Sequence, residues 1–176
     1  MQKLKLFLSL LMLIAFSIGN VLATDVTTPV SGSNYRFKAT LSSTDYYLVA
    51  PTSSGMGTVS TTQSEGTVFT FTKESSNWYI TFVSGTTTYY MYESSSNGQV
   101  TISTTKTKVS TVTTNTTSGK TYAKIGGTKW IQFNGGANPK RMGCYSSSQT
   151  GVVLEEVTGT QETTLFREPL LDPYKF

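Results

Sequence analysis

An all-β fold is predicted for this 176-residue chain by three observations. The chain is rich in Thr and Tyr, and β-branched and aromatic side chains pack well on a pleated sheet. Several short segments alternate apolar and polar residues, as expected of strands with one buried face. These segments recur every 41 to 43 residues, which indicates internal repeats. We therefore expect twelve short strands in three repeats of about 41 residues, over 35–77, 78–120 and 121–157.

The first strand of each repeat is the clearest. It is expected at Tyr35–Ala39, at Trp78–Phe82 and at Thr121–Ile125, and each segment begins 43 residues after the one before. In the first segment apolar residues alternate with charged ones, which is the two-residue period of a strand with one buried face. Equivalent inward positions are Phe37, Ile80 and Ala123, followed by Ala39, Phe82 and Ile125.

The later strands keep a similar register. Because a slip of one residue would turn every side chain to the other face, such consistent spacing favours repeated structure. We expect Cys144 to point inward and to behave as a small buried hydrophobe. Inward positions of the second strands are Leu48, Met91 and Ile131, those of the third are Val59, Val100 and Met142, and those of the fourth are Phe71, Val112 and Leu154, preceded two residues earlier by Phe69, Ser110 and Val152.

The number, length and apolar positions of these repeats resemble a β-trefoil over residues 35–157. The segments 47–50 and 130–133 look like the Tyr-Leu strands of fascin-like trefoils. This resemblance implies that the first and fourth strands form a six-stranded barrel and that the second and third form hairpin caps. The Gln-any-Trp motif typical of ricin-type lectins is absent from the three fourth strands, which puts ricin-like sugar binding in doubt. A two-sheet β-sandwich is the main alternative.

The two ends of the chain differ from the repeats. Residues 1–23 have the layout of a signal peptide, with Lys3 and Lys5 before an apolar run from Leu6 to Gly19 and a small residue at Ala23. That run is shorter than a membrane span, so we expect a secreted, periplasmic or cell-surface protein without a transmembrane anchor after cleavage. A flexible leader follows over 24–34, and a tail of unassigned role covers 158–176.

Composition excludes several kinds of chemistry. The chain has no His and one Cys, which removes His-dependent triads, His-ligated metal sites and internal disulfides. Glu155 and Glu156 are adjacent on a strand and should point to opposite faces, unlike the paired carboxylates of glycosidases. We expect a non-catalytic protein that needs neither metal nor cofactor.

Aromatic residues suggest a binding role. Tyr47, Tyr90 and Trp130 occupy equivalent positions next to inward residues and should face outward, where sugar rings stack on aromatic faces. Asp45 could accept hydrogen bonds from sugar hydroxyls, although an Asp in an ordinary turn explains it as well. The alternative for the three rings is packing beneath loops. The leading hypothesis is an exported module that binds a glycan or another surface ligand, and the competing one is a protein-interaction, structural or inhibitor module.

Basic residues dominate the second half of the repeats. Seven lie between Ser94 and Leu154, with no acidic residue among them. Gathered on one side, they would attract anionic glycans or another anionic surface polymer, whereas scattered they would only solvate the surface. Loss of Lys3 and Lys5 from the 14 basic residues leaves 12 against 10 acidic ones, so nucleic acid is an unlikely partner. The seven are Lys106, Lys108, Lys120, Lys124, Lys129, Lys140 and Arg141.

Overall fold

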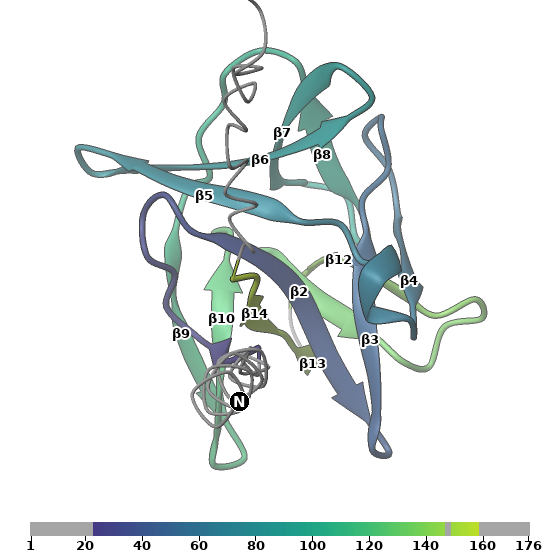
Figure 1. Cartoon of the computed structure of the whole chain (residues 1–176). Helices are drawn as coiled ribbons and strands as arrows, with labels where there is room; N and C mark the ends of the chain where they lie inside the picture. The colour runs from purple at the N-terminus through teal and green to yellow at the C-terminus, as the bar shows by residue number, and fades with distance from the viewer. Residues whose placement is uncertain (1–22, 147–148, 159–176) are drawn as a thin grey trace, which may run out of the picture.

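The computed structural model describes residues 23–146 and 149–158 as an all-β protein whose strand pairs are all antiparallel (Figure 1). Its helical content in these residues is a single 3-10 turn, η1, at Gln63–Glu65. The strands are β1 (Asp25–Val26), β2 (Asn34–Leu41), β3 (Thr44–Val49), β4 (Gly57–Ser60), β5 (Phe69–Glu74), β6 (Asn77–Ser84), β7 (Thr87–Glu93), β8 (Val100–Ser103), β9 (Val112–Thr117), β10 (Lys120–Ile125), β11 (Trp130–Asn134), β12 (Arg141–Tyr145), β13 (Thr150–Gly151) and β14 (Val153–Glu156).

Two of the expected segments lie almost wholly outside this description. The signal peptide was assigned to residues 1–23 and the tail to 158–176, of which only the residues at 23 and 158 are described. Within residues 23–146 and 149–158, no helix has the length and apolar character needed to cross a membrane.

Twelve strands form one large sheet, and β9 pairs with β10 in a separate hairpin. Most neighbours in the sheet are consecutive in the chain, while β2 also pairs with β5 and β14, and β12 also pairs with β4. Isolated bridges connect the hairpin to the sheet, from Trp78 to Val109 and from Ala123 to Val152. Two further bridges connect the segment before β4 with the start of β8, from Gly55 to Val100, and the residue before β8 with β12, from Gln99 to Cys144.

Alternating burial explains why the long strands form where the sequence predicts them. In β2 the side chains of Tyr35, Phe37 and Ala39 are buried, and the residues between them are more exposed. The tight turn after β2 uses Ser42 and Ser43, with φ of 49° and 63°. Two successive left-handed residues give the turn twist that suits a two-residue hairpin.

The core forms where inward faces of strands from all parts of the chain meet. Phe71 is fully buried, and its ring centroid lies 5.4 Å from that of Tyr35 and 5.8 Å from that of Phe37. Cys144 is buried and free, as the repeat register predicts, and burial raises the pKa of its thiol to about 11. The expected inward residues Leu48, Met91 and Ile131 are buried as well.

Two details depart from the sequence-based expectation. The leader at 24–34 contributes strand β1, in which Asp25 is opposite Glu155 and Val26 is opposite Leu154. Ser110 was aligned with the buried residues Phe69 and Val152, but it is exposed and Val109 is buried instead. Neighbouring residues of an extended chain point to opposite faces, so the burial of Val109 leaves Ser110 facing outward. The backbone N–H of Ser110 donates to both carboxylate oxygens of Glu93, at 3.0 and 3.1 Å.

Candidate functional site

The three aromatic residues proposed as a ligand platform have different surroundings. Tyr47 is 6% exposed, and its hydroxyl donates to Glu155 Oε2 at 3.2 Å. Tyr90 is half-buried on β7, opposite Thr81 and Ser103. Trp130 is 9% exposed and lines a cavity. Trp130 is therefore the one of the three that lines this cavity.

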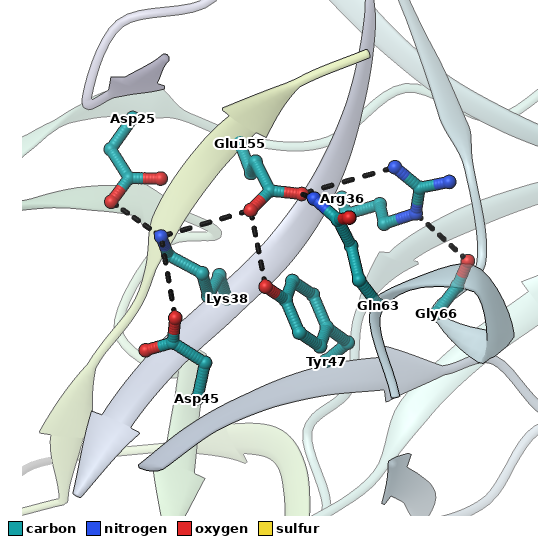
Figure 2. Close-up of polar contacts among 8 residues, drawn as sticks. All are labelled: Asp25, Arg36, Lys38, Asp45, Tyr47, Gln63, Gly66 and Glu155. Carbon is teal, nitrogen blue, oxygen red and sulfur yellow. Dashed lines mark hydrogen bonds and ion pairs between the residues drawn. The ribbon is translucent and has the colours of Figure 1, made fainter. Parts of the chain in front are cut away.

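A polar cluster surrounds Glu155, whose carboxylate is almost completely buried (Figure 2). We call it the Glu155 network. Gln63 Nε2 donates to Glu155 Oε1 at 2.6 Å, and Arg36 Nη1 lies 3.8 Å from the same oxygen. Arg36 Nε also donates to the carbonyl of Gly66 at 3.3 Å. The network consists of Asp25, Arg36, Lys38, Asp45, Tyr47, Gln63, Gly66 and Glu155.

Lys38 lies between three carboxylates in this network. Its Nζ is 2.6 Å from Asp25 Oδ2, 3.8 Å from Asp45 Oδ2 and 3.7 Å from Glu155 Oε2. Burial alone would lower the pKa of Lys38, but its hydrogen bond to Asp25 and the three negative charges outweigh burial and raise it. Asp45 also accepts a hydrogen bond from Thr40 Oγ1 at 2.6 Å. Asp45 therefore accepts a hydrogen bond across the β2–β3 turn and forms an ion pair with Lys38.

The Glu155 network joins segments that are distant in sequence. It holds the leader through Asp25, the turn η1 through Gln63 and the β2–β3 hairpin through Asp45 against β14. Its buried carboxylate is fully used by hydrogen-bond donors and cations within the protein. The arrangement serves to fasten the fold. In the described part of the chain, no group of three His, Cys, Asp or Glu side chains is placed to hold a metal ion.

Tyr47 should make the protein sensitive to alkaline pH. Burial, the charge of Glu155 and the hydrogen bond to it raise the pKa of Tyr47 to about 12, against an ordinary value of 10.0. The folded protein holds the Tyr47 hydroxyl proton more tightly than the unfolded chain does. The resulting stabilisation is fully present below pH 10 and is lost as the pH rises from 10 to 12. We expect the Tyr47 contribution to the free energy of unfolding to fall by roughly 2–3 kcal/mol over that interval.

Urea unfolding at several pH values from 9 to 12 would measure this loss. Tyr47→Phe should lower stability at pH 9 and flatten the dependence above pH 10. Tyr90→Phe, on the half-buried face of β7, serves as the matched control and should retain the wild-type slope. An unchanged slope in Tyr47→Phe would contradict the assignment.

A second group of residues lines a partly open cavity. We call it the Trp130 cavity, and its volume is about 360 Å³. The lining contains indole and phenol rings, three carboxamides and several hydroxyls, and none of its described residues is charged. Its residues are Asn115, Thr117, Ser118, Tyr122, Trp130, Gln132, Ser146, Gln149, Thr150 and Gly151.

One wall of the Trp130 cavity is the β9–β10 hairpin. Its two-residue turn consists of Ser118 and Gly119, both left-handed with φ of 51° and 74°, as this hairpin type requires. This turn sets Asn115 opposite Tyr122 across the ladder. Paired residues project to the same side of a sheet, so the amide and the phenol ring line the cavity together.

The facing wall comes from β11 and β13. Trp130 and Gln132 lie two residues apart and project to one face of β11, while Ile131 and Phe133 enter the core. Gln132 Nε2 donates to the carbonyl of Tyr145 at 2.7 Å, and its Oε1 accepts the backbone N–H of Gln149 at 3.2 Å. The buried Gln132 amide therefore holds the backbone at Tyr145 and at Gln149 in place.

Gly151 allows the two walls to approach. A Cβ at this position would overlap the ring of Tyr122 and lie 2.6 Å from Cδ1 and Cδ2, so any larger residue would displace the ring. The Tyr122 side chain thus rests directly on the backbone of β13.

The basic residues come from several parts of the fold. Lys106 bonds both carboxylate oxygens of Glu74 at 2.6 Å, and Lys108 donates to Asn77. Lys129 donates to the carbonyl of Ser95. Lys120 and Lys124 lie on β10, whereas Lys140 and Arg141 lie at the start of β12, after the loop on the other side of the molecule in Figure 1. Arg141 Nη1 contacts Met56 Sδ at 2.7 Å.

Sequence reasoning identified Trp130 but missed most of the cavity around it. Tyr122 lies within the strand expected at 121–125 but is not among the expected site residues, and neither is Asn115. The signal that could have paired them is the Ser118-Gly119 turn, because a two-residue turn at that point sets Asn115 opposite Tyr122. Gln132 and Gln149 have no such local signal, since tertiary packing brings them to the cavity.

Comparisons with known proteins add no family to this picture. Nothing among protein-family models, curated proteins or solved structures matches the chain. The function must therefore be argued from the site alone.

Proposed function

We propose that this protein is an exported, non-catalytic module that binds a carbohydrate in the Trp130 cavity. The observation that carries the proposal is the lining: two aromatic side chains and three carboxamides around a space without charge. Sugar hydroxyls both donate and accept hydrogen bonds, and a carboxamide offers both functions in one group. The aromatic rings of Tyr122 and Trp130 supply apolar surface for the C–H face of a sugar ring.

The degree of exposure assigns different tasks to these groups. Gln132 is 1% exposed and is used by Tyr145 and Gln149, so it shapes the cavity and makes little contact with a ligand. Trp130 is largely buried, whereas Tyr122 and Asn115 are half-buried and more open to a ligand. We therefore assign ligand contact mainly to Tyr122, Asn115 and Gln149.

A binding role suits the cavity better than a catalytic one. General acid–base and nucleophilic catalysis need a positioned carboxyl, imidazole, thiol, amine or activated hydroxyl. None of the residues lining the Trp130 cavity is Asp, Glu, Lys or Cys, and its Ser and Thr hydroxyls have no basic side chain beside them in that lining. The buried carboxylate of Glu155 is occupied within its own network.

We further infer that the strands form a β-trefoil of three repeats. The pairing partners support this: β2 with β5, β5 with β6, β9 with β10 and β14 with β2. The bridges from Trp78 to Val109 and from Ala123 to Val152 supply the two remaining links of a six-membered ring of strands. The bridges from Gly55 to Val100 and from Gln99 to Cys144, with the pairing of β12 and β4, agree with three hairpin caps that meet at one end.

A glycan array followed by calorimetry tests the binding proposal. We expect Tyr122→Ala and Asn115→Ala each to weaken binding of an array hit at least tenfold, about 1.4 kcal/mol, because each removes a direct contact. Tyr90→Ala, which lies on β7 and outside the lining, is the matched aromatic control and should bind as wild type. No hit on the array, together with capture of a stoichiometric protein partner by all these variants, would overturn the proposal in favour of a protein-interaction module.

A further inference from the structure

A second cavity adjoins the Trp130 cavity on the other side of Tyr122. We call it the Lys120 cavity, and its volume is about 310 Å³. Tyr122, Thr150 and Gly151 line both cavities, so the Tyr122 ring resting on Gly151 forms their shared wall. Its lining comprises Asp25, Lys38, Ala39, Thr40, Lys120, Thr121, Tyr122, Thr150, Gly151 and Val153.

The two cavities differ in charge. The described residues that line the Trp130 cavity are all uncharged, whereas those that line the Lys120 cavity include two cations and one carboxylate. Asp25 and Lys38 bind each other at 2.6 Å, so each largely neutralises the other. Lys120 lies exposed at the start of β10 and forms no ion pair among residues 23–146 and 149–158. Among the charged side chains of this lining, Lys120 is therefore the one that no carboxylate of the described residues pairs.

Lys120 lies close in the sheet to residues that line the Trp130 cavity. Lys120 and Tyr122 are two residues apart on β10 and project to the same face. On the paired strand, Thr117 is opposite Lys120 and Asn115 is opposite Tyr122, and both line the Trp130 cavity. Lys120 therefore lies on the same face as Tyr122, in the lining of the cavity that shares Tyr122 with the Trp130 cavity.

We propose that the ligand is an acidic oligosaccharide, with a neutral sugar unit in the Trp130 cavity and a carboxylate or sulfate of an adjacent unit at Lys120. This inference rests on the proposed function, because it uses the same site. An amino sugar is disfavoured, since Asp25, the carboxylate in the lining, is already bound to Lys38. A charge-assisted hydrogen bond from Lys120 to the anion would add affinity that depends on salt concentration.

Matched glycan pairs test this inference. An array would carry uronic-acid oligosaccharides beside their methyl esters, and sulfated oligosaccharides beside their desulfated forms. We expect the acidic member of a recognised pair to bind about tenfold more tightly than its neutral counterpart at low salt, and the difference to shrink at high salt.

Two substitutions separate the cation from the rest of the site. Lys120→Gln should reduce affinity for the acidic member to that of the neutral one and leave neutral binding unchanged. Lys124→Gln is the control, because it changes a cation on the same face of β10 that lies outside both linings.

The outcomes distinguish the two proposals. Equal binding of acidic and neutral members, both weakened by Tyr122→Ala, would overturn the acidic ligand and leave the carbohydrate site standing. An acidic preference that survives Lys120→Gln would also overturn the assignment of Lys120. Absence of binding to every member would overturn both proposals.

Discussion

Glu155→Ala should lower the free energy of unfolding by about 3–5 kcal/mol, the range typical of breaking a buried ion pair by removing one partner. The substitution leaves Tyr47 and Gln63 without their shared acceptor and removes one of the anions facing Lys38. It also leaves Arg36, whose side chain is 16% exposed, with no carboxylate at its Nη1. Urea unfolding near neutral pH measures the change.

Two further variants make the Glu155 result interpretable. Glu155→Gln retains an oxygen that can accept from Tyr47 but loses the negative charge, so we expect an intermediate loss of about 1–3 kcal/mol. Glu74→Ala removes a carboxylate 2.6 Å from Lys106, but both of those side chains are half exposed. Exposed pairs contribute about 1 kcal/mol or less. A loss from Glu155→Ala as small as that from Glu74→Ala would show that the Glu155 network does not fasten the fold.

Phe71→Ala should destabilise the protein by about 3–5 kcal/mol, because it removes a fully buried ring and leaves a cavity that its neighbours cannot fill completely. Phe71 makes ring contacts with Tyr35, Phe37 and Trp78, the last at a centroid distance of 6.4 Å. These neighbours lie on β2 and β6, so the cavity would open between the two strands that pair with β5.

Thermal and urea unfolding measure the Phe71 effect. Phe71→Leu keeps most of the apolar volume and should cost less than Phe71→Ala. Val83→Ala is a matched control on a neighbouring strand, since Val83 is 67% exposed, and its change should stay within about 0.5 kcal/mol. A Phe71→Ala protein as stable as Val83→Ala would contradict the position of this ring in the core.

The sequence predicts the strands well where alternation is strong. The segments 35–39, 78–82 and 121–125 lie within β2, β6 and β10 because every second side chain enters the core. Prediction fails where local pattern carries no information. Strand β1 has two residues and pairs with β14, and the register near β9 is shifted by one residue, so that Val109 is buried and Ser110 exposed.

The candidate site is only partly visible in the sequence. Trp130 could be singled out because it follows the strand period next to an inward Ile131. The same rule led to Tyr47, which has the same outward register but is covered by Glu155 and its partners. Register tells which face a side chain takes, whereas contacts between distant segments decide whether that face is open. Gln149 and Gly151 enter the cavity through such contacts.

The pairing of β1 with β14 has a mechanical consequence. The two strands are antiparallel, and the N–H of Glu156 donates to the carbonyl of Thr24 at 2.9 Å, so both segments leave the sheet at the same end. Tension applied between residues 24 and 157 therefore loads these hydrogen bonds one after another, in the unzipping direction. Under tension, β1 should separate from β14 before the rest of the sheet opens. The ion pair between Asp25 and Lys38 should be the first ionic contact to break.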